Sequence, residues 1–91
     1  MAVTVHIPSL LRGYCEGART LSVEAPSVRA ALAEIARMHP ALYRNICDET
    51  DAVRRHLGVF VNTTHIRDLD GLETALASGD AVTILPAVSG G

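Results

Sequence analysis

Aromatic residues are scarce in this chain of 91 residues. There is no tryptophan, and the aromatic positions are Tyr14, Tyr43 and Phe60. The core must therefore be built from Val, Leu, Ile and Ala, which contribute most of the 48% hydrophobic share. A chain of this length lies at the small end of the domain range. We expect one domain with a single core, too small to surround a large buried cofactor.

Strong charge of one sign and long hydrophobic runs are also lacking. The net charge is −2, so the chain has no basic field of the kind that attracts a phosphate backbone. No apolar run approaches the roughly 20 residues that cross a bilayer. The first residues lack the basic start and apolar stretch of a signal peptide. The sequence therefore predicts a cytoplasmic protein with no nucleic-acid partner and no membrane partner.

Recognisable catalytic and metal-binding motifs are absent as well. Cys15 and Cys47 form no CxxC pair, and the four histidines lack metal-ligand spacing. In a reducing compartment the two cysteines are expected to be free thiols. The sequence contains no P-loop, dinucleotide fingerprint, HExxH or nucleophile elbow. We therefore expect a protein that is not an enzyme and that binds no metal or cofactor of its own.

Hydrophobic periodicity predicts five strands and one long helix. Period-two alternation indicates strands at 3–7, 20–24, 57–61 and 82–86, with a short return strand near 65–66. Ser27 is a helix N-cap, and the helix it begins should end just before Pro40. Two weaker patterns predict short helical turns at 42–46 and 72–76. The polar segment 48–56 is predicted to be an exposed loop.

The order strand, strand, helix, strand, short strand, strand predicts an α+β fold. One main helix packed across one face of a mixed sheet would bury both apolar surfaces within the available length. This order suits the ubiquitin-like β-grasp architecture, although other small α+β folds share it. We expect residues 1–86 to form this domain and residues 87–91 to form a flexible tail that carries Gly-Gly.

The Gly90-Gly91 end is the remaining candidate for chemistry, because the sequence contains no internal catalytic motif. Glycine has no β-carbon, so this segment could thread a narrow channel in another protein and present the carboxylate of Gly91 to a buried active site. A carboxylate is ionised at neutral pH and is a poor electrophile. It would need activation, and adenylation by a nucleotide-using partner is the plausible route.

With these features the sequence resembles the ubiquitin-like sulfur carriers of the MoaD/ThiS group over essentially its whole length. The most specific part is 79–91, which resembles the family's Gly-Asp turn, last strand, Pro-Ala-Val and terminal Gly-Gly. The resemblance implies that an E1-like enzyme uses ATP and magnesium to adenylate Gly91. A sulfur donor would then form the thiocarboxylate, and the carrier would donate sulfide to a second enzyme.

The resemblance leaves several pathways open. Residues 3–12 look like the carriers of cysteine biosynthesis, whose acceptor is a pyridoxal-phosphate enzyme and whose new cysteine is removed by a zinc protease. A molybdopterin synthase small subunit, which would act with the large subunit, is an alternative. The segment Ile7-Pro8-Ser9 departs from the Phe-Ala-x-Leu-Arg-like pattern of those subunits. Thiosugar and thiamine carriers are further alternatives.

The terminal Gly91 also admits two other functions, and the strand pattern predicts one docking surface. A ubiquitin-like modifier would join Gly91 to lysine side chains, and a plain interaction module would not need Gly91. For the carrier, the tail residues Ala87, Val88, Ser89 and Gly90 would enter the partner. If alternate residues of the last strands face the helix, Phe60 and Leu85 point outward and are candidates for partner binding. The alternatives are that Phe60 points inward after a register shift or is simply a lone exposed apolar residue.

Overall fold

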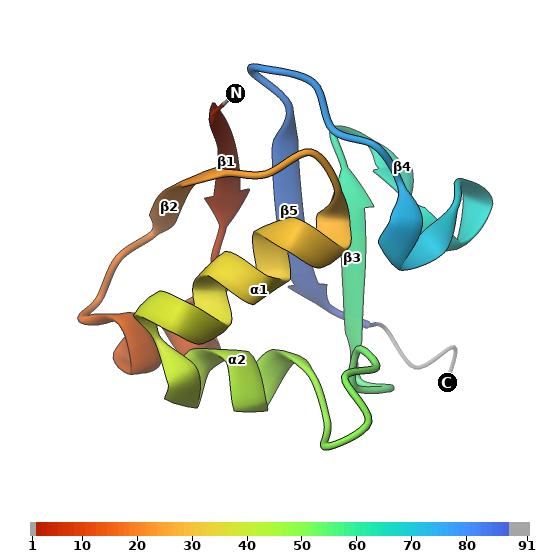
Figure 1. The fold of residues 1–91 in the computed structure, drawn as a ribbon. Helices are drawn as coiled ribbons and strands as arrows, with labels where there is room; N and C mark the ends of the chain where they lie inside the picture. The colour runs from red at the N-terminus through yellow and green to blue at the C-terminus, as the bar shows by residue number, and fades with distance from the viewer. Residues whose placement is uncertain (1, 88–91) are drawn as a thin grey trace.

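The computed structural model describes residues 2–87, and its centre is one five-stranded mixed sheet (Figure 1). The strands are β1 (Ala2–His6), β2 (Thr20–Glu24), β3 (Leu57–Val61), β4 (Thr64–His65) and β5 (Ala81–Pro86). Their spatial order is β2-β1-β5-β3-β4. β1 and β5 are parallel, and the other neighbouring strands are antiparallel. The last strand of the sequence therefore lies in the middle of the sheet.

Two α-helices cover one face of this sheet (Figure 1). The longer, α1 (Val28–Met38), is capped by Ser27, whose side-chain oxygen accepts a hydrogen bond from the backbone N–H of Ala30 at 3.1 Å. The shorter, α2 (Pro40–Ile46), follows directly. Three short 3-10 helices complete the described elements: η1 (Ser9–Cys15), η2 (Ile66–Asp68) and η3 (Gly71–Glu73).

The helical predictions are confirmed for α1 and need correction elsewhere. The turn expected at 42–46 is a seven-residue helix, because Pro40 both ends α1 and starts α2 at a position where its missing N–H costs nothing. The polar segment 48–56 is not wholly exposed, because Val53 is half-buried and bridges to Cys47. The helix η1 was not predicted at all.

The core lies between the helices and one face of the sheet. The alternation of β3 and β5 is as predicted, with the side chains of Val59, Val61, Val82 and Ile84 all at most 8% exposed. They pack with the buried stripe of α1, which consists of Val28, Ala31, Leu32 and Ile35. No described helix is long and apolar enough to span a membrane.

This arrangement is the predicted ubiquitin-like β-grasp fold, with a mixed sheet and one main helix across one face. The strand β5 ends at Pro86, and the backbone N–H of Ala87 donates to the carbonyl of His56 at 2.7 Å. The end of β5 thus lies beside the start of β3. The division into a domain at 1–86 and a tail at 87–91 stays a prediction, because 88–91 lie outside the described residues.

Candidate functional site

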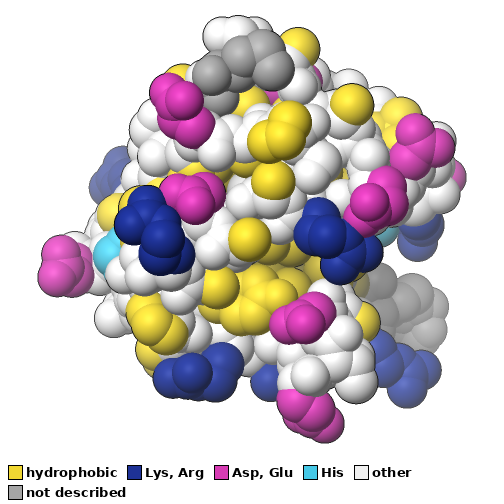
Figure 2. Space-filling view, viewed as in Figure 1, with side chains coloured by type: hydrophobic (Ala, Val, Ile, Leu, Met, Phe, Trp, Pro, Cys, Tyr) yellow, Lys and Arg dark blue, Asp and Glu magenta, His cyan; other side chains and the backbone are white. Residues whose placement is uncertain are grey.

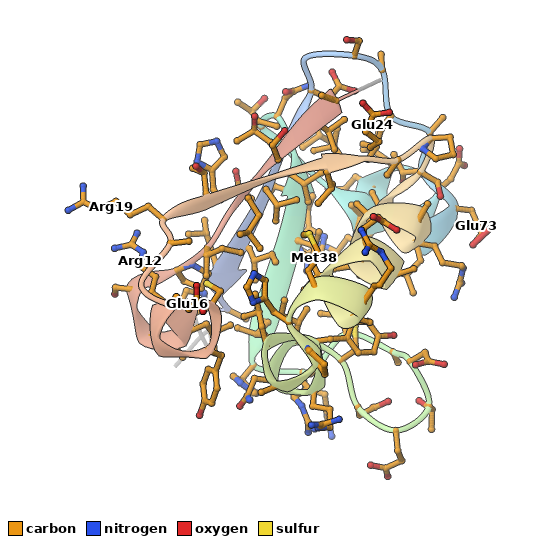
Figure 3. All side chains as sticks on the ribbon, turned by 60° about the vertical axis from the view of Figure 1, so that its left-hand side comes forward. Arg12, Glu16, Arg19, Glu24, Met38 and Glu73 are labelled. Carbon is orange, nitrogen blue, oxygen red and sulfur yellow. The ribbon has the colours of Figure 1, made fainter. Side chains whose placement is uncertain are left out.

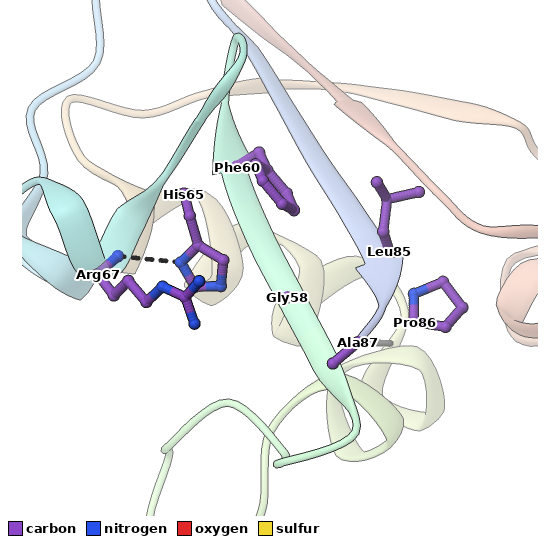
Figure 4. Close-up of a pocket in the computed structure, with 7 residues that line it drawn as sticks. All are labelled: Gly58, Phe60, His65, Arg67, Leu85, Pro86 and Ala87. Carbon is purple, nitrogen blue, oxygen red and sulfur yellow. Dashed lines mark hydrogen bonds between the residues drawn. The ribbon is translucent and has the colours of Figure 1, made fainter. Parts of the chain in front are cut away.

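A hollow of about 270 Å³ opens on the sheet face away from the helices, where β5 ends (Figure 4). Strand β5 and the residue after it form one side of the hollow, β3 forms the floor, and β4 with the start of η2 forms the other side. The lining residues are Gly58, Phe60, His65, Arg67, Leu85, Pro86 and Ala87. The hollow therefore lies at the point where the chain leaves the sheet.

The register of β3 and β5 brings the two predicted docking residues together. Gly58 pairs with Leu85, and Phe60 pairs with Thr83, so Phe60 and Leu85 belong to the same outward-facing set. Leu85 is 45% exposed and Phe60 is half-buried. The outward orientation inferred from alternation is confirmed. The role of these two residues in partner binding stays a prediction.

His65 shapes the hollow through contacts with two neighbours. Its ring packs edge-on against Phe60, with 5.0 Å between the ring centroids and 67° between the ring planes. Its Nδ1 accepts a hydrogen bond from the backbone N–H of Arg67 at 3.0 Å. The neutral ring therefore carries its proton on Nε2. That nitrogen lies over Gly58, where a β-carbon would be only 3.3 Å away.

Arg67 is the charged residue among those that line the hollow. Its side chain is exposed and forms no ion pair with any residue in the range 2–87. Figure 4 shows it at the rim opposite Leu85 and Pro86. The hollow thus combines an apolar wall with a single cation that has no counter-charge of its own.

The structure describes only one of the predicted tail residues, Ala87. Ala87 is described, is exposed and lines the hollow. Val88, Ser89, Gly90 and Gly91 lie outside the described residues.

Both cysteines are free thiols, as predicted, and the structure shows that both are buried. Burial is the main cause that raises the pKa of the Cys15 thiol and the pKa of the Cys47 thiol. A raised pKa leaves less of the reactive thiolate at neutral pH. Within residues 2–87, no three His, Cys, Asp or Glu side chains come close enough to hold a metal ion.

A second, shallower hollow lies on the helix-covered side, between α1 and the segment after α2. It is lined by Arg29, Ala33, Ala36, Tyr43 and Asp51. The Tyr43 hydroxyl donates to Asp51 Oδ1 at 2.8 Å, and Arg29 pairs with Glu73. Figure 2 shows apolar side chains at the centre of this face with charged side chains around them. Its charged groups Arg29 and Asp51 each have a partner, Glu73 and the Tyr43 hydroxyl respectively, whereas Arg67 forms no ion pair with any described residue.

Gly58, His65 and Arg67 were not identified from the sequence. The period-two pattern of 57–61 places Gly58 and Phe60 on the same face, so Gly58 could have been found. His65 and Arg67 depend on the pairing of β4 with β3, in which Phe60 is opposite His65. A two-residue strand leaves almost no pattern in a sequence.

Comparison with known protein families shows to which family the chain belongs. A family model described as the ThiS family matches residues 13–91. The chain belongs to the ThiS family. This confirms the resemblance to ubiquitin-like sulfur carriers of the MoaD/ThiS group.

Relatives of this ThiS-family chain match it over all or nearly all of their length. The sulfur carrier protein CysO of Mycobacterium tuberculosis is 34% identical over 93 residues, with 100% of both chains covered. A chain in the crystal structure of the Amycolatopsis orientalis BexX/CysO complex has a TM-score of 0.87 at 32% identity, covering 98% of this chain and 99% of that one. The solution structure of small archaeal modifier protein 1 from Methanosarcina acetivorans has a TM-score of 0.84 at 31% identity. The match covers 99% of this chain and 96% of that one.

Proposed function

We propose that this ThiS-family chain is a sulfur carrier whose working atom is the carboxylate of Gly91. The observation that carries the proposal is the family match, which runs through Gly90 and Gly91. A carboxylate oxygen of Gly91 attacks the α-phosphorus of ATP, bound with magnesium by an E1-like partner, and pyrophosphate leaves. Sulfide from a donor then displaces AMP and leaves a thiocarboxylate. The chain is the protein co-substrate, and its partners supply the catalysis.

The division of labour follows from the chemistry of the terminus. A free carboxylate is ionised and resists attack by nucleophiles, so an activated intermediate is required. A thiocarboxylate sulfur is ionised and nucleophilic at neutral pH, and it attacks an electrophile held by a second enzyme. Val88, Ser89, Gly90 and Ala87 would occupy the channel of that enzyme, and Phe60 and Leu85 would lie against its surface.

Cysteine biosynthesis is the pathway we favour, because full-length relatives at 34% identity are named CysO sulfur carriers. The acceptor would then be a pyridoxal-phosphate enzyme, and a zinc protease would release the new cysteine from the tail. A molybdopterin synthase small subunit, a thiosugar carrier and a thiamine carrier are the other pathways. All of these activities would take place in the cytoplasm.

A protein modifier is the second candidate function. It is favoured by the likeness to small archaeal modifier protein 1, at 31% identity and a TM-score of 0.84. In this reading the adenylated Gly91 would be attacked by a lysine amine of a target protein instead of by sulfide. The first step is shared by the two functions, so the product formed after adenylation distinguishes them.

Intact-protein mass spectrometry tests the proposal. The full chain and a variant that lacks Gly91 are incubated with ATP, magnesium, a sulfide source and extract of the native host. We expect the full chain alone to gain the mass of one sulfur-for-oxygen exchange. Adducts on other proteins, without that gain, would establish the modifier. An identical response of both chains would overturn both functions.

A further inference from the structure

The hollow beside Ala87 must come close to any enzyme that acts on Gly91. Four residues, 88–91, follow Ala87, and four extended residues span at most about 14 Å. An active site that holds the carboxylate of Gly91 therefore lies within about 14 Å of the hollow. We expect the partner's surface around its active-site entrance to lie against β3 and the end of β5, because Ala87 lines the hollow together with residues of these strands. This step depends on the proposed function, because it takes Gly91 as the reacting residue.

The chemistry of the hollow restricts what the partner places there. Phe60, Leu85 and Pro86 present apolar surface, and Leu85 is 45% exposed. Arg67 stands at the rim with no ion pair among the described residues. A guanidinium beside apolar surface is matched by a carboxylate next to an aliphatic side chain. A free phosphate is a poor match, because the hollow offers one exposed cation and an apolar floor.

We propose that the hollow receives an aliphatic side chain from a segment of the enzyme that acts on Gly91. A carboxylate on the same segment pairs with Arg67. The Nε2–H of His65, over Gly58, limits the depth to which that side chain enters. Gly58 is a positioning residue, because a β-carbon there would displace the His65 and Phe60 rings that shape the floor. The carrier thus recognises an acidic-aliphatic segment of the partner.

A fragment titration tests this pairing without knowledge of the partner. The probe is N-acetyl-leucine, which carries an aliphatic side chain beside a carboxylate. N-acetylleucinamide lacks the carboxylate, and N-acetylglycine lacks the side chain. Backbone amide shifts of the isotope-labelled full chain are followed by NMR. We expect N-acetyl-leucine to shift the amides of Gly58, Phe60, His65 and Leu85, and both comparison fragments to bind more weakly.

The Arg67→Gln variant tests the role of the charge. Loss of one exposed ion pair should weaken binding of N-acetyl-leucine about two- to fivefold. Arg19→Gln is the matched control, because Arg19 is an exposed arginine next to β2, the opposite edge strand of the sheet (Figure 3). The control should bind as the natural chain does. Equal binding by Arg67→Gln, or shifts confined to the hollow between α1 and Asp51, would overturn the proposal.

Two other occupants of the hollow, the chain's own last residues and a second copy of the chain, would each give a different result in the same titration. A chain shortened to end at Ala87 keeps every element that the structure describes. If it binds N-acetyl-leucine several-fold more tightly than the full chain, the chain's own last residues occupy the hollow and the proposal is overturned. Shifts of the same amides with protein concentration alone would assign the hollow to a second copy, with the same consequence.

The same samples separate this inference from the proposed function. Thiocarboxylation of Gly91 is measured by mass, and fragment binding is measured by NMR. A chain that gains sulfur but does not bind N-acetyl-leucine at the hollow overturns the inference alone. A chain that binds the fragment with the expected dependence on Arg67 but is never thiocarboxylated overturns the proposed function, and with it the identity of the partner as a sulfur-transfer enzyme.

Discussion

The ring of His65 packs edge-on against Phe60 directly over Gly58, where a side chain is missing. The ring centroids are 5.0 Å apart. An added β-carbon at Gly58 would lie 3.3 Å from His65 Nε2 and 3.4 Å from Phe60 Cε1. The floor of the hollow therefore depends on one glycine in the middle of a buried strand.

Gly58→Ala should move these rings while the fold remains intact. His65 is half-exposed on a two-residue edge strand, so its ring has room to move. Loss of the aromatic pair costs about 0.5–1.5 kcal/mol, and the reduced freedom of the unfolded chain returns about 0.4–1 kcal/mol. We expect the free energy of unfolding in urea to change by less than about 1 kcal/mol, with altered ring-proton shifts of His65.

Gly13→Ala is the control for this change. A β-carbon at Gly13 meets nothing within 4 Å, so the His65 ring shifts should stay as in the natural chain. Unchanged ring shifts in Gly58→Ala would show that the glycine does not shape the floor.

Ile84 and Leu85 are neighbours on β5 whose side chains face opposite sides of the sheet. Ile84 is 0% exposed and Leu85 is 45% exposed. Ile84→Ala should reduce the free energy of unfolding by about 2–5 kcal/mol, because it leaves a cavity in the core. Leu85→Ala should cost less than about 1 kcal/mol, yet it should weaken N-acetyl-leucine binding, because it removes one wall of the hollow. Denaturation and the fragment titration report the two effects separately.

The reverse pattern would contradict this assignment of the two faces. Ile84→Val serves as the milder core variant, with an expected cost of about 0.5–1.5 kcal/mol, in case Ile84→Ala does not fold.

Asp80 fixes the turn before β5 through its carboxylate. It accepts hydrogen bonds from the backbone N–H of Ala77 at 2.9 Å and from the side-chain amide of Asn62 at 3.3 Å. These bonds, that of Ala77 foremost, lower the pKa of Asp80. A folded-state pKa below the unfolded value means that the stabilisation is present above the unfolded pKa, about 3.9, and is lost as the pH falls below it.

Asp80→Ala should therefore lower the melting temperature at pH 7, and the difference from the natural chain should shrink as the pH falls below about 4. Thermal melts across that range make the measurement. Asp68→Ala is the control, because no described group donates a hydrogen bond to that carboxylate, and it should leave the melting temperature at pH 7 close to that of the natural chain. A constant difference for Asp80→Ala would mean that its hydrogen bonds do not depend on ionisation.

Glu16 ends η1 with a left-handed backbone, at a φ of 60°. This region is unfavourable for residues with a β-carbon by about 1–2 kcal/mol, and glycine enters it freely. Glu16→Gly should raise the free energy of unfolding by about 0.5–1 kcal/mol, after the extra entropy of glycine in the unfolded chain is subtracted. Glu16→Ala should bring no such gain, and urea denaturation compares the two. Equal effects of both variants would trace the gain to the lost charge.

The sequence predicted the structure best in segments where one hydrophobic period is strong. The alternation in 57–61 and 82–86 predicted both strands and the outward face of Phe60 and Leu85. Ser27 and Pro40 marked the limits of α1. These features depend on local backbone geometry and on one buried face, which a single sequence displays.

The remainder depends on pairings between distant segments. The sequence does not show that β5 lies between β1 and β3 or that His65 lies opposite Phe60. The helix η1 was missed because Gly13 reads as a turn residue, although Leu11 and Cys15 are both buried. Arg67 looked like any other exposed charge, and its place at the rim becomes apparent only with the hollow.

Arginine accounts for all eight basic residues of the Lys and Arg class, and the chain contains no lysine. The guanidinium group stays protonated in proteins and is no nucleophile toward an acyl adenylate. If Gly91 is activated as proposed, no side-chain amine of one copy can therefore capture the Gly91 of another copy. An Arg19→Lys variant introduces one exposed side-chain amine far from the hollow. It tests whether Gly91, once activated, becomes linked to a lysine.

We expect Arg19→Lys, incubated with ATP, magnesium, sulfide and host extract, to gain the mass of one sulfur-for-oxygen exchange and to form no isopeptide-linked copies. Sulfide, delivered to the adenylate within the activating enzyme, should be the only nucleophile that reaches it. The natural chain is the control, since its side chains offer no amine. Linked copies that appear with Arg19→Lys and are absent from the natural chain would show that the activated terminus is open to lysine, and would favour the modifier over the carrier.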